Sequence, residues 1–217
     1  LSIVAVAVLP FGAVSIPSGE VLLLSLVSGV SYVGAIVLLY SALQRADASD
    51  VVPVVGAASA VTTFLMRFYF IDEALPTNFI WGFLLLVFGT ALISHYRFRW
   101  RGLTMVVLAG LLMGVSTMFV KLVFLETPPG VGGFMDGFFW TRMANVVAAF
   151  ALLAWPPTFY AVTRHERAAT KRATGYILSN KVLSGVAFLL VLIAINLGDV
   201  SLVNALSGTQ FVFLFVF

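Results

Sequence analysis

Three basic residues lie inside long apolar stretches of the sequence, where a charged group is costly: Lys121, Arg142 and Lys181. Ionisable side chains are rare in hydrocarbon and usually mark a functional site, so each of the three is a candidate. Each also has a purely structural interpretation, because a long basic side chain near the end of a membrane span can extend to the interface. No acidic residue lies clearly in mid-span, so the pattern favours an anionic or carboxylate-bearing solute over a cationic one.

Uncharged polar side chains recur every three residues in the last apolar stretch, as Asn204, Ser207 and Gln210. Amides and hydroxyls surrounded by lipid need hydrogen-bond partners, so these side chains are expected to point into the protein. There they would either contact a solute or form hydrogen bonds between helices, and both interpretations stay open. Tyr32 and Asn196 are weaker candidates of the same kind.

One helical face combines small residues with a cation, because Gly110, Gly114, Thr117 and Lys121 follow one another at helical spacing. A face of this kind could border a cavity, with Thr117 and Lys121 as its polar contacts. Gly110 and Gly114 also form a GxxxG motif, which in apolar helices serves close packing more often than ligand binding.

The sequence carries no motif of an enzyme active site. It contains no Cys, which excludes thiolate metal sites and cysteine nucleophiles. His95 and His165 lie far apart in the sequence, and neither an HExxH motif, a phosphate-binding glycine loop nor a nucleophile elbow is present. We therefore predict no catalytic residue, no metal site and no cofactor.

The composition points to a chain whose solvent is the lipid bilayer. Hydrophobic residues make up 61% of the chain and charged residues 10%, whereas a soluble domain has about 25% charged residues. So little charge cannot cover a globule in water. The basic residues stand in the gaps between apolar runs, as membrane topology requires, so no nucleic-acid partner is expected.

Apolar runs of about 20 residues, the length that crosses the hydrocarbon core, predict transmembrane helices. The runs are continuous rather than alternating, which favours helices over barrel strands. The predicted fold class is an all-α polytopic membrane protein with eight visible transmembrane helices, at 1–16, 21–43, 48–68, 77–96, 102–124, 134–155, 174–196 and 200–217.

A short pattern occurs twice, each time at the entry to an apolar helix. Asp47, Ser49, Val51 and Gly56 recur at one constant spacing as Asp199, Ser201, Val203 and Gly208. Asp and Ser suit the N-cap of the helix that follows. The two copies stand at the entries to the third and the eighth predicted spans. The chain crosses the membrane five times from one entry to the other, and this odd number places the copies on opposite sides. This arrangement predicts an inverted repeat, a construction typical of secondary transporters with a site between the halves.

The residues after the third span resemble the EamA-type family of the drug/metabolite transporter (DMT) superfamily. The family pattern has a Glu, a Leu and two Gly residues at fixed spacing. Glu73, Leu75, Gly82 and Gly89 match it, whereas Ala74 stands where a basic residue is usual. The resemblance covers the whole chain in span order and implies a ten-helix inverted five-plus-five repeat.

The resemblance further implies two repeats in this chain, 1–98 with helices two to five and 102–217 with helices six to nine. The first helix would precede residue 1, and the rest of the ninth helix and the tenth would follow residue 217. The implied function is transport of a small metabolite or drug-like solute by alternating access through a central cavity. A proton or another ion is an optional coupling partner, and the resemblance does not indicate the oligomeric state.

The expected location is the cell membrane, either a plasma membrane or an inner membrane. Basic residues concentrate in the links after the second, fourth and sixth spans, at Arg45, 97–101 and 164–172. The positive-inside rule places these links in the cytoplasm. The family resemblance implies cytoplasmic termini and so places the same links outside, and the orientation stays open.

Two alternatives to a transporter stay open. A membrane-embedded enzyme acting on lipid or isoprenoid substrates would need clustered acidic or His side chains at a membrane face, and Asp72 with Glu73 is the only local candidate. A non-transporting helical scaffold subunit would lack a cavity. A polar pocket between the halves would therefore separate the transporter from the scaffold.

Overall fold

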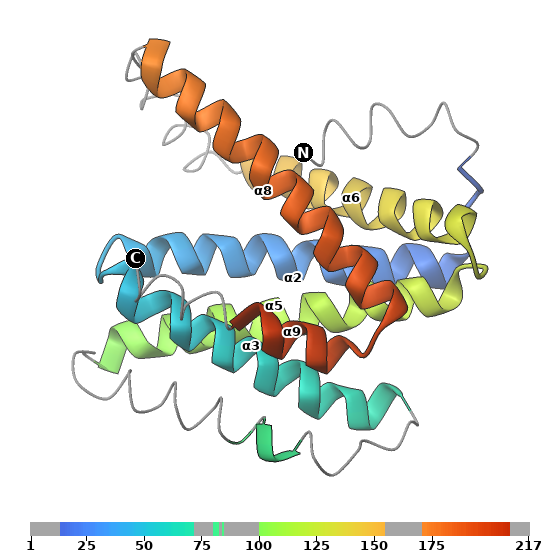
Figure 1. Cartoon of the computed structure of the whole chain (residues 1–217), viewed down its shortest axis with the longest axis horizontal. Helices are drawn as coiled ribbons and strands as arrows, with labels where there is room; N and C mark the ends of the chain where they lie inside the picture. The colour runs from blue at the N-terminus through green and yellow to red at the C-terminus, as the bar shows by residue number, and fades with distance from the viewer. Residues whose placement is uncertain (1–13, 72–79, 83, 85–99, 155–170, 209–217) are drawn as a thin grey trace.

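The computed structural model describes residues 14–71, 80–82, 84, 100–154 and 171–208, and in these ranges the chain forms helices and short turns without any strand. Figure 1 shows the six named helices: α2 (Gly19–Leu43), α3 (Ala48–Phe70), α5 (Trp100–Glu126), α6 (Val131–Leu153), α8 (Lys171–Leu197) and α9 (Val200–Gly208). The predicted all-α class is confirmed for this part of the chain.

The helices begin and end within a few residues of the predicted spans. This holds for α2, α3, α5, α6 and α8, and α9 is described as far as Gly208. The spans predicted at 1–16 and 77–96 lie almost entirely outside the described residues. The number of eight membrane helices and the division into two repeats therefore stay predictions.

Among the described residues, three helices are long and apolar enough to cross a membrane: Gly19–Leu43, Ala48–Phe70 and Gly102–Glu126. Val182–Leu197, within α8, is a shorter apolar stretch. α6 is as long as α3, but it contains an Asp, an Arg and an Asn, at positions 136, 142 and 145. The helical composition is thus that of a membrane protein.

α2 and α5 pack lengthwise against each other and form the centre of the bundle. α2 also packs on α6, and α5 also packs on α3, so the four helices form one continuous group. α8 runs obliquely to this group and contacts α5, α6 and α9, whereas the short α9 packs mainly on α3 (Figure 1). Segments from early and late in the chain, α3 and α9, are therefore neighbours.

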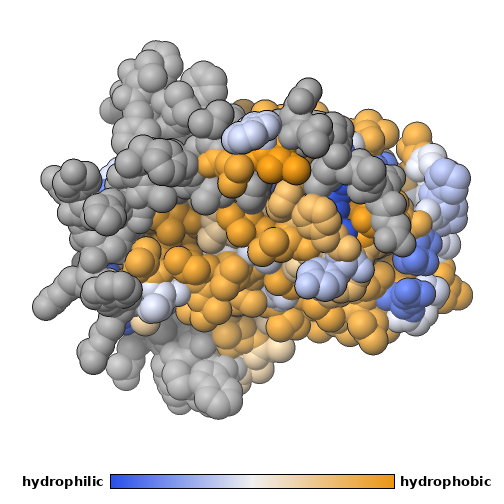
Figure 2. Space-filling view, turned by 90° about the horizontal axis from the view of Figure 1, so that it is seen from below, coloured by the Kyte–Doolittle hydropathy of each residue, from blue (hydrophilic) through white to orange (hydrophobic). Residues whose placement is uncertain are grey.

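The bundle has polar residues inside and apolar residues outside. On α2 the hydroxyl-bearing Ser25, Ser28 and Ser31 are buried, while large aliphatic side chains such as Leu23 and Val30 are more than half exposed. Figure 2 shows a broad apolar face, with hydrophilic residues gathered at one end of the molecule. Large apolar side chains on the outside, with buried hydroxyls beside the apolar core, fit helices whose outer surface meets lipid.

The GxxxG motif brings α5 into direct backbone contact with α3. A Cβ placed at Gly110 would lie 2.7 Å from the carbonyl oxygen of Val55, and one at Gly114 would lie 2.6 Å from that of Ser59. Gly29 of α2 approaches α6 in the same way, with the carbonyl carbon of Ala144 at 2.7 Å. The packing interpretation of Gly110 and Gly114 is confirmed, because only glycine lets the backbones approach so closely.

We expect Gly114→Ala to lower the free energy of unfolding by about 2 kcal/mol, the ordinary cost of overpacking a tight core. The added methyl would meet the carbonyl of Ser59 and the Cβ of Thr62, both at 2.6 Å. Gly175→Ala in α8 is the matched control, because no described atom lies within 4 Å of a Cβ there, and alanine favours the helix by up to about 1 kcal/mol. Thermal unfolding of the purified protein in detergent measures both variants, and equal melting temperatures would contradict the close approach.

The two copies of the repeated sequence pattern occupy the same place relative to their helices. Asp47 is the N-cap of α3, although its side chain forms no capping hydrogen bond. Asp199 directly precedes α9, and its carboxylate accepts hydrogen bonds from the backbone N–H of Ser201 at 2.8 Å and of Leu202 at 3.2 Å. Asp199 therefore caps α9 by the usual side-chain mechanism.

Two apolar clusters hold the bundle together at its opposite ends. One joins α2, α3 and α5 through residues that include Ala42, Val51 and Val106. The other joins α5, α6, α8 and α9 and includes Phe138 and Leu192. The space between the two clusters is where the helices enclose a cavity.

Candidate functional site

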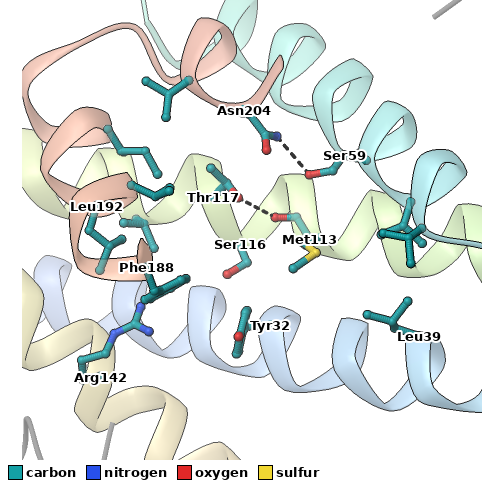
Figure 3. A pocket seen from close by; sticks show the side chains of 17 residues that line it. Tyr32, Leu39, Ser59, Met113, Ser116, Thr117, Arg142, Phe188, Leu192 and Asn204 are labelled. Atoms are coloured by element: carbon teal, nitrogen blue, oxygen red, sulfur yellow. Dashed lines mark hydrogen bonds between the residues drawn. The ribbon is translucent and has the colours of Figure 1, made fainter. Parts of the chain in front are cut away.

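A cavity of about 360 Å³ lies between the two apolar clusters, and every one of the six described helices contributes to its wall. Its polar lining consists of Tyr32 from α2, Ser59 from α3, Ser116 and Thr117 from α5, Arg142 from α6 and Asn204 from α9. The rest is mostly apolar, with Leu39, Val52, Val55, Met113, Val120, Phe188, Val191, Leu192, Ile195 and Val203. Figure 3 shows the labelled side chains around this space. Few polar groups on a mainly apolar wall are the usual composition of a small-molecule site.

Asn204 is held by α3 in one definite orientation. Its Nδ2 donates to Ser59 Oγ at 3.0 Å and to Thr63 Oγ1 at 2.7 Å, while Thr63 Oγ1 donates its own proton to the carbonyl of Ser59 at 2.9 Å. Because the Thr63 hydroxyl can then only accept from Asn204, the nitrogen of the amide must face α3. The amide oxygen consequently points into the cavity, as Figure 3 shows.

The hydroxyls of α5 are engaged with the helices themselves. Thr117 Oγ1 donates to the carbonyl of Met113, one turn earlier, at 2.9 Å. Ser116 Oγ lies 3.1 Å from Ser28 Oγ, and Ser28 Oγ also donates to the Ser116 carbonyl at 3.1 Å. These bonds satisfy the hydroxyl protons or share them between α2 and α5. Ser28 and Ser116 therefore join the two helices, and Ser116 also lines the cavity.

Arg142 enters the cavity wall from α6 and is 4% exposed. Its guanidinium lies over the ring of Phe188, with the central carbon 4.6 Å from the ring centre, and 5.9 Å from the ring centre of Phe138. Phe188 in turn stands 6.4 Å from the ring of Tyr32. The arginine is therefore flanked by aromatic faces, with its Nε lacking any hydrogen-bond partner.

The ammonium of Lys121 binds carbonyl groups at the C-terminal end of α8, and Lys121 does not line the cavity. Its ammonium donates to the carbonyls of Ile195 at 2.9 Å, Asn196 at 3.2 Å and Gly198 at 2.9 Å. These carbonyls belong to the last turn of a helix, where a cation also meets the negative end of the helix dipole. Neither Lys121 nor Asn196, both expected as cavity contacts, is among the residues that line this cavity.

A second basic residue fixes the same turn from the other side. Arg67, in the last turn of α3, places its NH2 group 2.8 Å from Asp199 Oδ2, and Arg67 is 4% exposed. Asp199 thus caps α9 and pairs with α3 at once. The α8–α9 turn is held by a cation from α3 and a cation from α5.

The remaining predicted residues divide into three groups. Gly56 lines the cavity, whereas no described atom lies within 4 Å of a Cβ placed at Gly82. Ser49, Ser201 and Gly208 are helical residues of α3 and α9. The side chains of Lys181 and Ser207 and the residues Glu73, Gly89 and Gln210 lie outside the described part of the chain.

The structure adds cavity residues that the sequence analysis did not single out, namely Ser59, Ser116 and Phe188. Ser59 follows Gly56 by three residues, so its position on the same helical face was available from the repeat. Ser116 lies next to Thr117 on α5. Phe188 carries no sequence signal, because one Phe in an apolar helix cannot be distinguished from the other Phe residues among the 20 in the chain.

No family model, curated protein or solved structure matches this chain. The resemblance to the EamA-type family therefore rests on the sequence residues that suggested it. Within the described ranges, no group of three or more His, Asp or Glu side chains is placed to hold a metal ion.

Proposed function

We propose that the chain is the helical core of a membrane transporter that moves a small solute through the cavity between its helices. The observation that carries this proposal is the cavity itself, which combines a buried arginine and an amide with an apolar wall inside a bundle whose outer surface is apolar. Its volume of about 360 Å³ lies within the 300–1,000 Å³ usual for ligand pockets. A dry, filled centre would have favoured a scaffold.

The EamA-type assignment and the inverted repeat form part of the same proposal. α3 and α9, which carry the two copies of the repeated pattern, pack directly on each other. Two elements related by a pseudo-two-fold axis are in contact when the axis passes between them, so this packing supports the repeat. The proposed halves, 1–98 and 102–217, both contribute to the cavity wall, as alternating access about a central site requires.

The proposed location is the plasma or inner membrane, and coupling to a proton or another ion is part of the family expectation. Transport is tested by reconstituting the full-length protein into liposomes and measuring uptake of a broad panel of labelled metabolites, with protein-free liposomes as the reference. Saturable uptake of at least one solute is expected. A correctly folded protein that moves none of them contradicts the proposal.

Filling the cavity should stop uptake without unfolding the protein. We expect Thr117→Phe to lower the initial uptake rate at least tenfold, because the added ring enters a space of about 360 Å³ that the solute must share. Leu111→Phe on the same helix is the matched control, since Leu111 is 39% exposed on the outer face. Uptake that survives Thr117→Phe would place the solute path elsewhere.

A further inference from the structure

Arg142 brings a positive charge to the cavity without a counter-charge among the described residues. It is 4% exposed, its Nε has no hydrogen-bond partner, and its guanidinium lies 4.6 Å from the ring centre of Phe188 and 5.9 Å from that of Phe138. An aromatic face attracts a guanidinium, but it accepts none of the five N–H bonds that the group offers in a fixed fork. The Nε atom is itself enclosed by protein, so a ligand in the cavity would bind the two terminal NH2 groups of Arg142, which lines the cavity wall.

Two acidic residues on or beside helices that line the cavity are already engaged with other groups. Asp136, on the same helix as Arg142, accepts hydrogen bonds from the backbone N–H of Ser15 at 3.1 Å and from the Ser15 hydroxyl. Asp199 pairs with Arg67 at 2.8 Å and caps α9. Neither carboxylate is placed to neutralise Arg142, whereas a bound anion in the cavity would do so.

We infer that the cavity binds an organic anion and that Arg142 holds its carboxylate through paired N–H···O bonds. This inference rests on the proposed function, since it names the class of solute that the transport cavity takes. The planar fork of a guanidinium matches the two oxygens of a carboxylate, and the pair is strongest where water is excluded. The low polarity around Arg142, with Phe188 on its face, provides that exclusion.

On the other side of the cavity, the Asn204 amide oxygen is an acceptor that a hydrogen-bond donor of the ligand could bind. Both N–H bonds of the Asn204 amide are given to Ser59 and Thr63, so its Oδ1 faces the cavity as an acceptor. Much of the rest of the cavity wall is formed by aliphatic side chains such as Val120. The ligand class is thus a small monocarboxylate with an apolar body and a hydroxyl or other neutral donor away from the carboxylate.

Three aromatic probes of similar size separate these features: 4-hydroxyphenylacetate, phenylacetate, which lacks the donor, and tyramine, which replaces the carboxylate by a cation. Their binding to the full-length protein in detergent is measured by equilibrium dialysis. We expect 4-hydroxyphenylacetate to bind at least tenfold more tightly than tyramine and severalfold more tightly than phenylacetate. We expect Arg142→Met to weaken binding of both anions at least tenfold, and Asn204→Leu to remove only the preference for the hydroxylated one.

Arg142→Met should also unfold at the same temperature as the ligand-free wild type or a few degrees higher, because it removes a buried charge that lacks a partner. Arg45→Met is the control, since Arg45 is exposed and contacts Met105 outside the cavity. Unchanged affinities are expected for it. If Arg142→Met does not fold, Arg142→Lys keeps the charge but not the planar fork. Weaker binding of the anions to Arg142→Lys than to the wild type supports the inference, and wild-type affinity for them overturns the paired bonds.

Wild-type protein that binds neither anion, or that binds tyramine as tightly, overturns the inference. So does a folded Arg142→Met variant with wild-type affinity. If the liposomes take up only neutral or cationic solutes, the proposed transport function stands and the inference of an anionic ligand is overturned. Binding of the anions that depends on Arg142, without uptake of any solute, would support the anion site and reject transport.

Discussion

Replacing Arg67 by methionine is expected to lower the free energy of unfolding by about 3 kcal/mol, the lower end of the range for breaking a buried ion pair. The pair joins α3 to the N-terminus of α9 across 2.8 Å, with Arg67 almost fully buried and the Asp199 side chain 23% exposed. Partial exposure of Asp199, and its bonds to the backbone of α9, moderate the loss. Methionine keeps the apolar part of the arginine side chain, so the change reports on the charge.

The measurement is thermal unfolding in detergent, where about 3 kcal/mol corresponds to a decrease of roughly 6–12 °C for a chain of this size. Asp199→Asn retains an acceptor for the α9 cap and removes the charge. The double variant Arg67→Met with Asp199→Asn should lose less free energy of unfolding than the sum of the losses in the two single variants. The difference, which is the coupling energy of the pair, should be about 1–2 kcal/mol. Additive losses, or a loss in Arg67→Met no larger than in the exposed control Arg45→Met, would show that the pair does not stabilise the fold.

The sequence predicted the helices of this chain well because their signal is local. An apolar run such as 21–43 is long enough to cross a bilayer whatever surrounds it, and α2 accordingly covers Gly19–Leu43. The N-cap role of Asp199 is also local, since the carboxylate bonds to residues two and three positions later. The glycines of the GxxxG motif were assigned to packing correctly, because small residues at that spacing have few other uses in apolar helices.

The cavity was predicted only in part, because its members come from different helices. Tyr32, Thr117, Arg142 and Asn204 were candidates and line it, whereas Lys121 was a candidate and does not. Arg142 and Lys121 have the same sequence signal, a cation within an apolar run. The two residues differ in their hydrogen-bond partners. Lys121 donates to carbonyls at the end of α8, and no sequence spacing relates those carbonyls to α5.

The pairing of Arg67 with Asp199 was missed for a related reason. Arg67 was not among the candidates. It stands near the end of its span, where a basic residue usually extends toward the interface. Its burial follows from α9, which packs on α3 and brings Asp199 to it. Because α3 and α9 carry the two copies of the repeat, the ion pair connects the proposed halves directly.

Lys121→Met is expected to lower the free energy of unfolding by about 3 kcal/mol, because a charged donor with three acceptors is lost and hydrogen bonds to charged groups contribute about 1.5–3 kcal/mol each. The carbonyls of Ile195, Asn196 and Gly198 would be left at a helix end without that donor. Methionine fits the volume of the lysine stem, so packing around this part of α5 changes little. The loss should appear as faster hydrogen exchange at the end of α8 as well as a lower melting temperature.

The same experiment separates Lys121 from Arg142 by the sign of the effect on stability. Lys121→Met removes a charge with three acceptors and should destabilise the protein, whereas Arg142→Met removes a charge whose Nε has none and should not. Anion binding should respond in the opposite way, with a large loss for Arg142→Met and a small one for any Lys121→Met protein that stays folded. If Lys121→Met leaves the melting temperature unchanged and abolishes binding, then Lys121 contacts the ligand and the helix-capping role assigned to it is wrong.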